Sequence, residues 1–156
     1  MKKNQKGFSL IELLIVVAII LIIAAIAIPN LLRSRMAANE ASAVGSLRTI
    51  NTACVTFQTT YPSVGFPATL AALGTSGAAS STAADLIDSV LAAGTKSGYT
   101  FTYTVLAGST PATGYSTVAN ALSQGTSGTR GFYSDQSGVI RYKSLNGATS
   151  ADVPLQ

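Results

Sequence analysis

The sequence predicts an α+β fold, in which a long N-terminal α-helix packs against a C-terminal antiparallel β-sheet of about four strands. An apolar segment runs from Phe8 to Ile28 and is followed by an amphipathic helical pattern up to about Thr60. Segments with strand-like alternation begin at Tyr99. A helical half followed by a run of strands is typical of α+β proteins, and 156 residues suffice for one domain beyond the apolar segment.

The apolar segment Phe8 to Ile28 contains one charged residue, Glu12. As a helix it would be about 31 Å long at ~1.5 Å per residue, which is enough to cross a bilayer. Three lysines precede the segment, so the positive-inside rule predicts a cytoplasmic N-terminus and an exported C-terminal body, although two arginines after it weaken this asymmetry. No convincing cleavage site of the A-x-A type follows Ile28, so we expect the segment to be retained as an anchor.

The second half of the helix is predicted from a regular apolar stripe. The stripe residues recur at steps of four, three, four and three: Ala43, Leu47, Ile50, Cys54 and Phe57. The helix should end near Thr60, before the Tyr61-Pro62 pair. Because Cys54 lies on the stripe, we interpret it as a small buried core residue and not as a reactive thiol.

Residues 61–98 are predicted to form a loop-rich crossover with short helices. "PATLAALG" is compatible with one or two helical turns that Gly74 closes. "STAADLIDSVLAAG" predicts a short helix that begins near Ser81 or Thr82 and ends before Gly94. Asp85 and Asp88 would then share a helix face, and we interpret them as a solvated helix start in preference to a catalytic carboxylate pair.

Four strands are predicted in residues 99–156. "YTFTYTV" alternates aromatic or apolar residues with threonine, so one of its faces should cover the helix. "GYSTVANAL" is a weaker strand, and "RGFYSDQSGVIRY" indicates a hairpin that turns between Asp135 and Gly138. We interpret the aromatic residues of these strands as core and cross-strand packing in preference to a ligand platform.

Composition argues against catalysis, a metal site and a nucleic-acid interface. Three of the ten basic residues precede Gly7, which leaves seven basic and six acidic residues after it. The chain has no histidine and one cysteine, so no histidine-based triad, Cys-based zinc site or intramolecular disulfide can form. We therefore predict no enzyme activity, no catalytic or metal-binding residues and no cofactor. Arg130, Arg141 and Lys143 suggest a weakly supported basic patch for nucleic acid, and a charged sheet edge is the preferred interpretation.

The segment "KGFSLIELLIVVAIILIIAAIAIPNLLRSR" resembles the N-terminus of type IV pilins and pseudopilins. A short basic leader ends in Gly7, Phe8 follows, Glu12 lies at the fifth position of the remaining chain, and the apolar helix has Pro29 near its end. The resemblance covers about the first 35 residues and implies a pilin-like fold. It also implies that a prepilin peptidase cuts between Gly7 and Phe8 and that Phe8 is then N-methylated.

The resemblance suggests a role for Glu12 and Phe8 in filament assembly. A carboxylate in hydrocarbon costs about 2.5–3.5 kcal/mol and usually has a partner. Cleavage would create an amine on Phe8, and in the family the glutamate is thought to meet the amine of a neighbouring subunit. A wrongly docked subunit would leave both charges unpaired, at a cost of about 3–5 kcal/mol. In the alternative interpretation, Glu12 lies at the membrane interface near the positive end of its helix.

Pro29 also has two interpretations. It removes a backbone donor and disfavours the helical region for the residue before it. Either the helix ends there at the membrane boundary, or Pro29 is the point at which the helix kinks or locally melts during assembly.

These expectations give five segments: a leader (1–7), a membrane-spanning and assembly half of the helix (8–32), an amphipathic half (33–60), the crossover (61–98) and the sheet with its C-terminal tail (99–156). The function implied by the resemblance is that of a structural subunit of a type IV pilus. Its expected partners are other pilin subunits, prepilin peptidase, the inner-membrane assembly machinery and, before assembly, membrane lipid. We expect an inner-membrane prepilin and then an extracellular pilus. The alternatives are a pseudopilin of type II secretion, forming a periplasmic filament, and a minor or DNA-uptake pilin.

Overall fold

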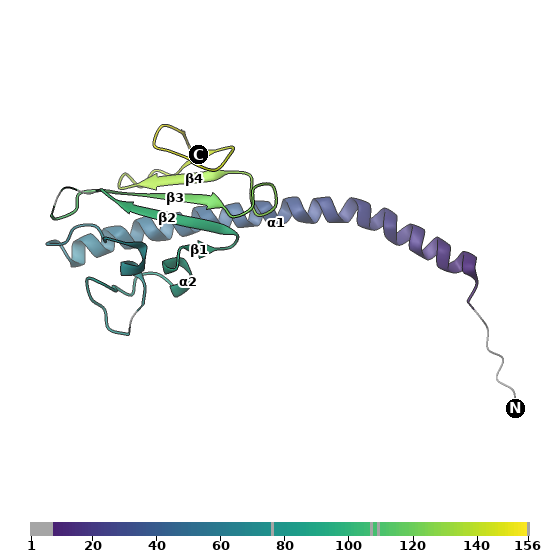
Figure 1. Ribbon diagram of the computed structural model, residues 1–156, viewed down its shortest axis with the longest axis horizontal. Coiled ribbons are helices and arrows are strands. Elements are labelled where there is room, and N and C mark those ends of the chain that lie inside the picture. The colour runs from purple at the N-terminus through teal and green to yellow at the C-terminus, as the bar shows by residue number, and fades with distance from the viewer. Residues whose placement is uncertain (1–7, 76, 107, 109, 156) are drawn as a thin grey trace, which may run out of the picture. The chain divides into compact units, whose positions relative to one another are not determined.

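The computed structural model describes residues 8–75, 77–106, 108 and 110–155. The chain divides into two compact units, Met1–Arg35 and Met36–Gln156, which are described separately here. A single helix, α1 (Leu10–Thr60), runs from the first unit into the second (Figure 1). It ends at Thr60, as the sequence predicts.

The first unit consists, in its described part, of residues 8 and 9 and of α1 up to Arg35. The residues here are mainly Leu, Ile, Val and Ala, with Pro29 inside the helix. In an apolar medium a helix is stable because it satisfies its backbone hydrogen bonds within itself. Its sequence therefore suits a helix that is surrounded by lipid or by other helices.

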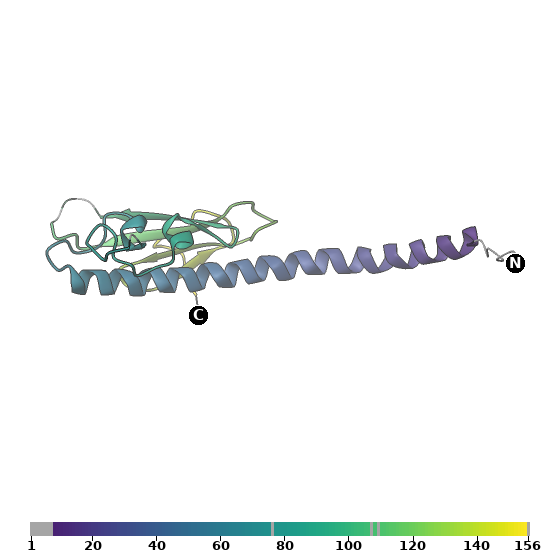
Figure 2. The same ribbon diagram turned by 90° about the horizontal axis from the view of Figure 1, so that it is seen from below.

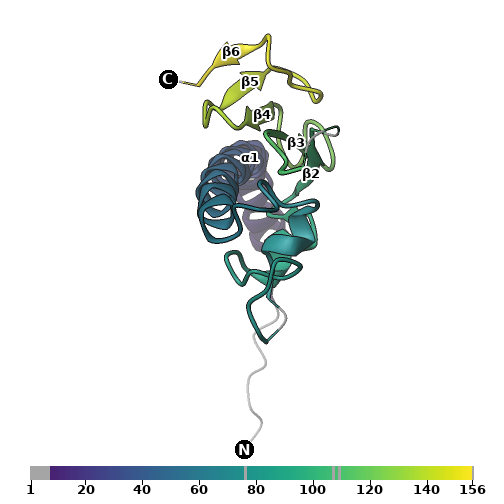
Figure 3. The same ribbon diagram turned by 90° about the vertical axis from the view of Figure 1, so that its left-hand side faces the viewer.

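The second unit has one hydrophobic core, and the predicted stripe of α1 forms one side of it. All five stripe residues are buried: Ala43, Leu47, Ile50, Cys54 and Phe57. Aromatic and small residues of the strands belong to the same cluster, among them Tyr99, Phe101, Tyr115, Ala119 and Phe132. The sheet thus lies along the part of α1 that belongs to this unit (Figure 3).

The sheet has six strands, and every neighbouring pair is antiparallel. The strands are β1 (Thr95–Lys96), β2 (Tyr99–Val105), β3 (Tyr115–Ala121), β4 (Gly131–Asp135), β5 (Arg141–Lys143) and β6 (Val153–Pro154). They follow each other in sequence order and form one layer beside α1 (Figure 2). The four predicted strands correspond to β2–β5. The predicted number was too low because β1 and β6 have two residues each, which is too short for an alternating pattern.

The alternation in "YTFTYTV" sets which face of β2 meets the core. Tyr99 and Phe101 are buried, whereas Thr102 and Thr104 are exposed. Tyr99 pairs with Ala121 and Phe101 with Ala119, so large residues of β2 lie opposite small residues of β3. A one-residue slip would expose the aromatic rings, and the register is therefore strongly specified.

The first short helix of the crossover follows the prediction. The 3₁₀ helix η1 spans Leu70–Leu73, and Gly74 closes it by donating its N–H to the carbonyl of Ala71 at 3.0 Å. Leu70 and Leu73 are buried in the core of the second unit.

The second short helix, α2, is shorter than predicted and starts later. It spans only Ser89–Ala92, and its N-cap is Asp88, so the expected start near Ser81 or Thr82 is wrong. The reason lies in the preceding backbone, where the N–H groups of residues 84–87 donate to carbonyls of residues 72–74 and not along a helix. The expected end is correct, because Gly94 follows the helix with φ +80°.

Candidate functional site

The carboxylate of Glu12 is bound by the backbone at the start of its own helix. Ser9 precedes the first residue of α1, and its N–H donates to Oε2 of Glu12 at 3.0 Å. This is one half of the capping box that a serine three residues before a glutamate can form. It satisfies a backbone donor that has no partner within the helix, and the negative charge also suits the positive end of a helix. The Ser9-x-x-Glu12 spacing was present in the sequence, but our sequence analysis did not use it.

Phe8 and Glu12 lie close together in sequence at the start of the apolar segment. Phe8 is exposed, with 74% of its surface accessible. Its nitrogen is a peptide nitrogen in this chain, so the amine that the predicted cleavage would create is absent here. The predicted cleavage position involves Gly7, which lies outside the described residues.

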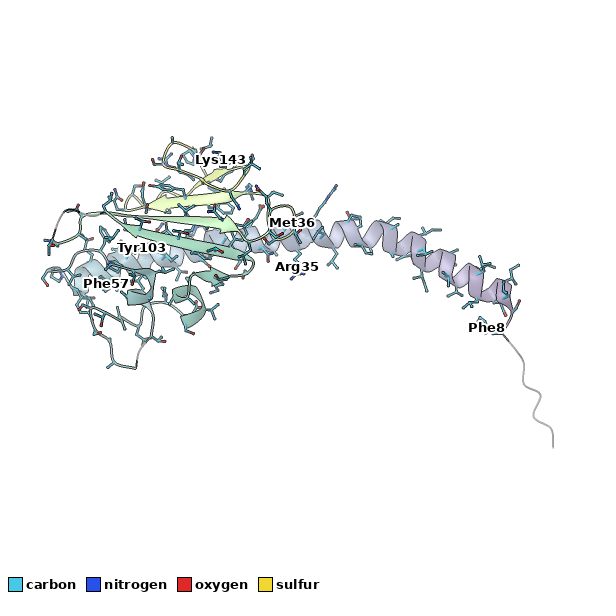
Figure 4. The ribbon with its side chains drawn as sticks, in the orientation of Figure 1. Phe8, Arg35, Met36, Phe57, Tyr103 and Lys143 are labelled. Atoms are coloured by element: carbon cyan, nitrogen blue, oxygen red, sulfur yellow. The ribbon has the colours of Figure 1, made fainter. Side chains whose placement is uncertain are left out.

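The apolar side chains of the first unit are exposed around α1. Figure 4 shows side chains that project from this part of the helix on both sides of the ribbon. Large apolar residues here have more than half of their surface accessible, among them Leu10, Ile11, Ile20, Ile23 and Ile26. Within the described residues, α1 is the one helix long and apolar enough to cross a membrane, and its most apolar window has a mean hydropathy of 3.3 with no residue buried. A helix that is apolar on all sides needs lipid or other helices around it.

Pro29 lies inside α1, and helical structure continues beyond it. The interpretation in which the helix ends at Pro29 is therefore wrong. The missing backbone donor remains, so Pro29 stays the predicted point for a kink or local melting.

Two residues of the suspected basic patch are engaged within the second unit. Arg130 forms an ion pair with Glu40 of α1, with 2.8 Å between Nε and Oε2. Its guanidinium also lies over the rings of Phe132 and Tyr142, at 5.6 and 5.5 Å from their centroids. Arg141 donates from Nη1 to the carbonyl of Asp152 at 3.1 Å. These contacts favour the interpretation of a charged sheet edge over that of a nucleic-acid surface.

Glu40 accepts four hydrogen bonds in the second unit, and our sequence analysis did not predict them. The carboxylate is buried and accepts hydrogen bonds from the backbone N–H groups of Thr129 and Arg130, from the Thr129 hydroxyl and from Arg130 Nε. Burial alone raises the pKa of Glu40, but these hydrogen bonds and the charge of Arg130 outweigh it and hold the pKa below its ordinary value.

Three buried polar groups form a second network that the sequence did not reveal. Asn51 of α1 donates to the hydroxyl of Ser134 at 2.8 Å, and its amide oxygen accepts from the hydroxyl of Tyr115 at 3.0 Å. Burial raises the pKa of Tyr115, so its hydroxyl remains a donor. Asn51 thereby connects α1 with β3 and β4.

The aromatic residues serve packing, as expected. Tyr99, Tyr115 and Phe132 are buried, and Tyr103 stacks on Tyr115 with ring centroids 5.5 Å apart. Burial raises the pKa of Tyr99 to about 12, and its hydroxyl donates to the carbonyl of Arg130 at 2.8 Å. Within the described ranges, no group of three or more His, Cys, Asp or Glu residues lies together as a potential metal site.

The comparisons with known proteins concern the N-terminal segment. Residues 2–28 match the prokaryotic N-terminal methylation motif. A 38-residue stretch is 66% identical to the type IV wide pilus major component PilA4 of Thermus thermophilus, and it covers 24% of this chain and 29% of that protein. The N-terminal part of this chain is thus similar to the N-terminal part of type IV major pilins. The resemblance that the sequence indicated is thereby confirmed.

Further pilins match over a longer stretch. The type IV major fimbrial protein FimA of Dichelobacter nodosus is 52% identical over 58 residues, which cover 35% of this chain and 37% of that protein. The type IV major pilin protein PilA of Myxococcus xanthus is 48% identical over 54 residues, which cover 35% of this chain and 24% of that protein. The chain thus spans well under half of the length of the curated relatives that it matches. No solved structure matches it.

Proposed function

We propose that this chain is the structural subunit of a type IV pilus. In this proposal residues 1–7 are a leader that prepilin peptidase removes between Gly7 and Phe8, and Phe8 is then N-methylated. Residues 8–32 span the inner membrane and later form the filament core, while residues 33–60, 61–98 and 99–156 build the exported part. The match of residues 2–28 to the methylation motif supports this reading.

The observation that carries the proposal is the combination of an apolar helix, exposed around its axis, with a single carboxylate in its first turn. Such a surface is stable in lipid and also against other apolar helices. When the helix moves from the membrane into a filament, its apolar side chains therefore need not be exposed to water. The carboxylate is the exception, because it needs a partner in either environment.

After cleavage, the amine of Phe8 would supply such a partner. In the uncut chain, the Ser9 N–H holds the Glu12 carboxylate at the start of the helix. A mature subunit adds a positive charge about 6 Å away along the axis, at ~1.5 Å per residue. We propose that Glu12 of one subunit pairs with the Phe8 amine of a neighbour and so sets the register of the filament.

The test begins with intact mass and N-terminal sequencing of the protein in sheared surface filaments and in membranes of the same cells. We expect an abundant sheared species that starts at Phe8 and is heavier by one CH₂ than the unmethylated chain from Phe8 onward, because N-methylation replaces a hydrogen with a methyl group. A processed species confined to membranes would instead indicate a pseudopilin or a minor subunit. An uncut chain that retains residues 1–7 would contradict the proposal.

Two variants of Glu12 separate its two roles. Glu12→Ala removes both the cap and the charge and should leave the processed protein in the membrane. Glu12→Gln keeps an oxygen that can accept from the Ser9 N–H but lacks the charge. If the charge pair sets the register, Glu12→Gln should also fail to appear in sheared filaments. If Glu12→Gln assembles normally, the charge pair is not needed, and the role of Glu12 is to cap the start of α1.

A further inference from the structure

Two arginines, Arg33 and Arg35, follow the apolar part of α1 and have no assigned role. Both are exposed in the first unit. Within the described part of the chain, neither forms an ion pair or a hydrogen bond through its side chain. The side chain of Arg35 projects away from α1 (Figure 4). A guanidinium has five donors and is charged at every physiological pH, so these two exposed groups are free to bind an anionic partner.

Their position along the helix matches the far boundary of a bilayer. Glu12 and Arg33 are 21 residues apart on α1, which corresponds to about 31 Å at ~1.5 Å per residue. The hydrocarbon core of a bilayer is about 30 Å thick. With Glu12 at one boundary of this core, Arg33 lies at the other, and Arg35 lies about 3 Å further into the headgroup region.

Their angular positions favour a partner that surrounds the helix. Residues two apart on an α-helix are separated by about 200° around its axis. Arg33 and Arg35 therefore project to nearly opposite sides of α1. A protein that docks on one side would meet one of them, whereas lipid headgroups around a single helix meet both.

The carboxylates of this chain are a poor match for the two arginines. In the first unit, the one described acidic residue is Glu12, at the other end of the apolar segment. In the second unit four of five acidic residues are engaged, namely Glu40, Asp88, Asp135 and Asp152. Among the described residues of its second unit, a second copy would thus offer a single unengaged side-chain carboxylate, that of Asp85, to two guanidinium groups.

We propose that Arg33 and Arg35 bind the phosphate groups of lipid headgroups at the membrane face opposite the leader. This inference rests on the proposed function, because it requires α1 to span the bilayer. A guanidinium can donate two parallel hydrogen bonds to a phosphate, which an ammonium cannot. The two contacts fix the depth of the helix before a subunit is withdrawn into a filament.

The test measures the distance between arginine carbons and lipid phosphorus. The full chain is labelled with ¹³C at the arginine guanidinium carbons and reconstituted in vesicles of phosphatidylcholine with a smaller share of phosphatidylglycerol, in a buffer free of phosphate. Rotational-echo double-resonance solid-state NMR then reports whether any guanidinium carbon lies next to ³¹P. We expect dephasing in the wild type and its loss in the double variant Arg33→Lys, Arg35→Lys. The matched control Arg48→Lys replaces an exposed arginine of the second unit and should show the same dephasing as the wild type.

The outcomes separate this inference from the proposed function. Protease protection of the reconstituted chain shows independently whether α1 spans the bilayer. A spanning helix without wild-type dephasing would overturn the phosphate contacts and leave the pilin proposal intact. Dephasing that persists in the double lysine variant would assign the contact to another arginine and would also overturn the inference. A chain that does not span the vesicles would contradict both.

Discussion

Glu40 shows how one carboxylate connects segments that are distant in sequence. Its hydrogen-bond partners Thr129 and Arg130 are 89 and 90 residues away, in the connection that leads into β4. The carboxylate lies on the buried side of α1, and Arg130 reaches it from a partly exposed position. Because a buried carboxylate without partners is costly, all four donors contribute to holding this connection on α1.

Glu40→Gln should lower the free energy of unfolding. The amide keeps one acceptor oxygen but turns an N–H₂ group towards the donors of Thr129 and Arg130, and the charge that pairs with Arg130 is lost. We expect a loss of about 1–3 kcal/mol. Thermal unfolding of the full chain in detergent, followed by circular dichroism, would measure it. Unchanged stability would mean that these contacts contribute nothing net.

The Glu40 carboxylate should make the stability of the second unit sensitive to acid. The pKa of Glu40 is lower in the folded state than its ordinary value of 4.5. Its contribution to stability is therefore complete above about pH 4.5 and is lost as the pH falls through the folded pKa. Unfolding curves at a series of pH values should show that the free energy of unfolding falls less in acid for Glu40→Gln than for the wild type. Equal losses would place the acid sensitivity elsewhere, for example at Asp88 or Asp152, whose pKa values are also lowered.

Cys54 should be inert in the folded protein. Burial raises the pKa of its thiol to about 12, and the side chain has no accessible surface. Since the thiolate is the reactive form, labelling by a water-soluble disulfide reagent at pH 8 should be slower by roughly a hundredfold or more than in the urea-unfolded chain. Absorbance of the released thiol follows the reaction. Rapid labelling of the folded chain would show that Cys54 is accessible.

At the residue scale, burial could be predicted where the pattern lies within a single segment of the sequence. The stripe that contains Leu47, Ile50 and Cys54 could be predicted from its period alone, and so could the burial of Tyr99 and Phe101. Glu40 and Asn51 could not, because their partners are on strands or connections more than 60 residues later in the sequence. The Ser9 cap of Glu12 is a local pattern and was predictable, although we did not predict it.

At the element scale, the length of a helix or strand determines whether its sequence pattern can be recognised. α1 and β2 were predicted with their correct ends at Thr60 and Val105 because they contain several repeats of their own period. The two-residue strands β1 and β6 contain no period at all. The start of α2 was predicted too early because the backbone before it forms hydrogen bonds with the residues around η1. Such hydrogen bonds between distant segments leave no local pattern in the sequence.

The cap of α2 can be tested by substitution. Asp88 accepts a hydrogen bond from the Leu91 N–H at 2.9 Å and forms an ion pair with Lys96 at 2.9 Å. Asp88→Ala should lower the free energy of unfolding by about 1 kcal/mol. The control is Asp85→Asn, at an exposed position outside the helix where φ is 55°, a region that asparagine tolerates. Equal losses in chemical denaturation of both variants would show that Asp88 has no special role as a cap.

At the scale of the whole molecule, the two units have different requirements. The second unit has its own core, which is built from the second half of α1, the crossover and the sheet. The first unit has an apolar helix whose side chains are exposed. The first unit therefore needs lipid or other helices around it, whereas the second unit buries its apolar core within itself.

The fragment Met36–Gln156 should consequently fold by itself in water. It retains every residue of the hydrophobic core and omits the exposed apolar side chains of the first unit. We expect a monomer with well-dispersed amide resonances in NMR and one cooperative unfolding transition. A fragment that aggregates or shows a collapsed amide spectrum would mean that the first part of α1 is needed for folding.

The order of the strands has a consequence for biogenesis. Each strand from β2 to β6 pairs with the strand that precedes it in the chain. Such local pairing keeps the contact order of the sheet low, which favours rapid folding. In the proposed topology the first part of α1 stays in the membrane and the part after Arg35 is exported first, so that each strand in turn would reach a neighbour that is already in place. The sheet could therefore grow strand by strand during translocation, with the edge strand β6 added last.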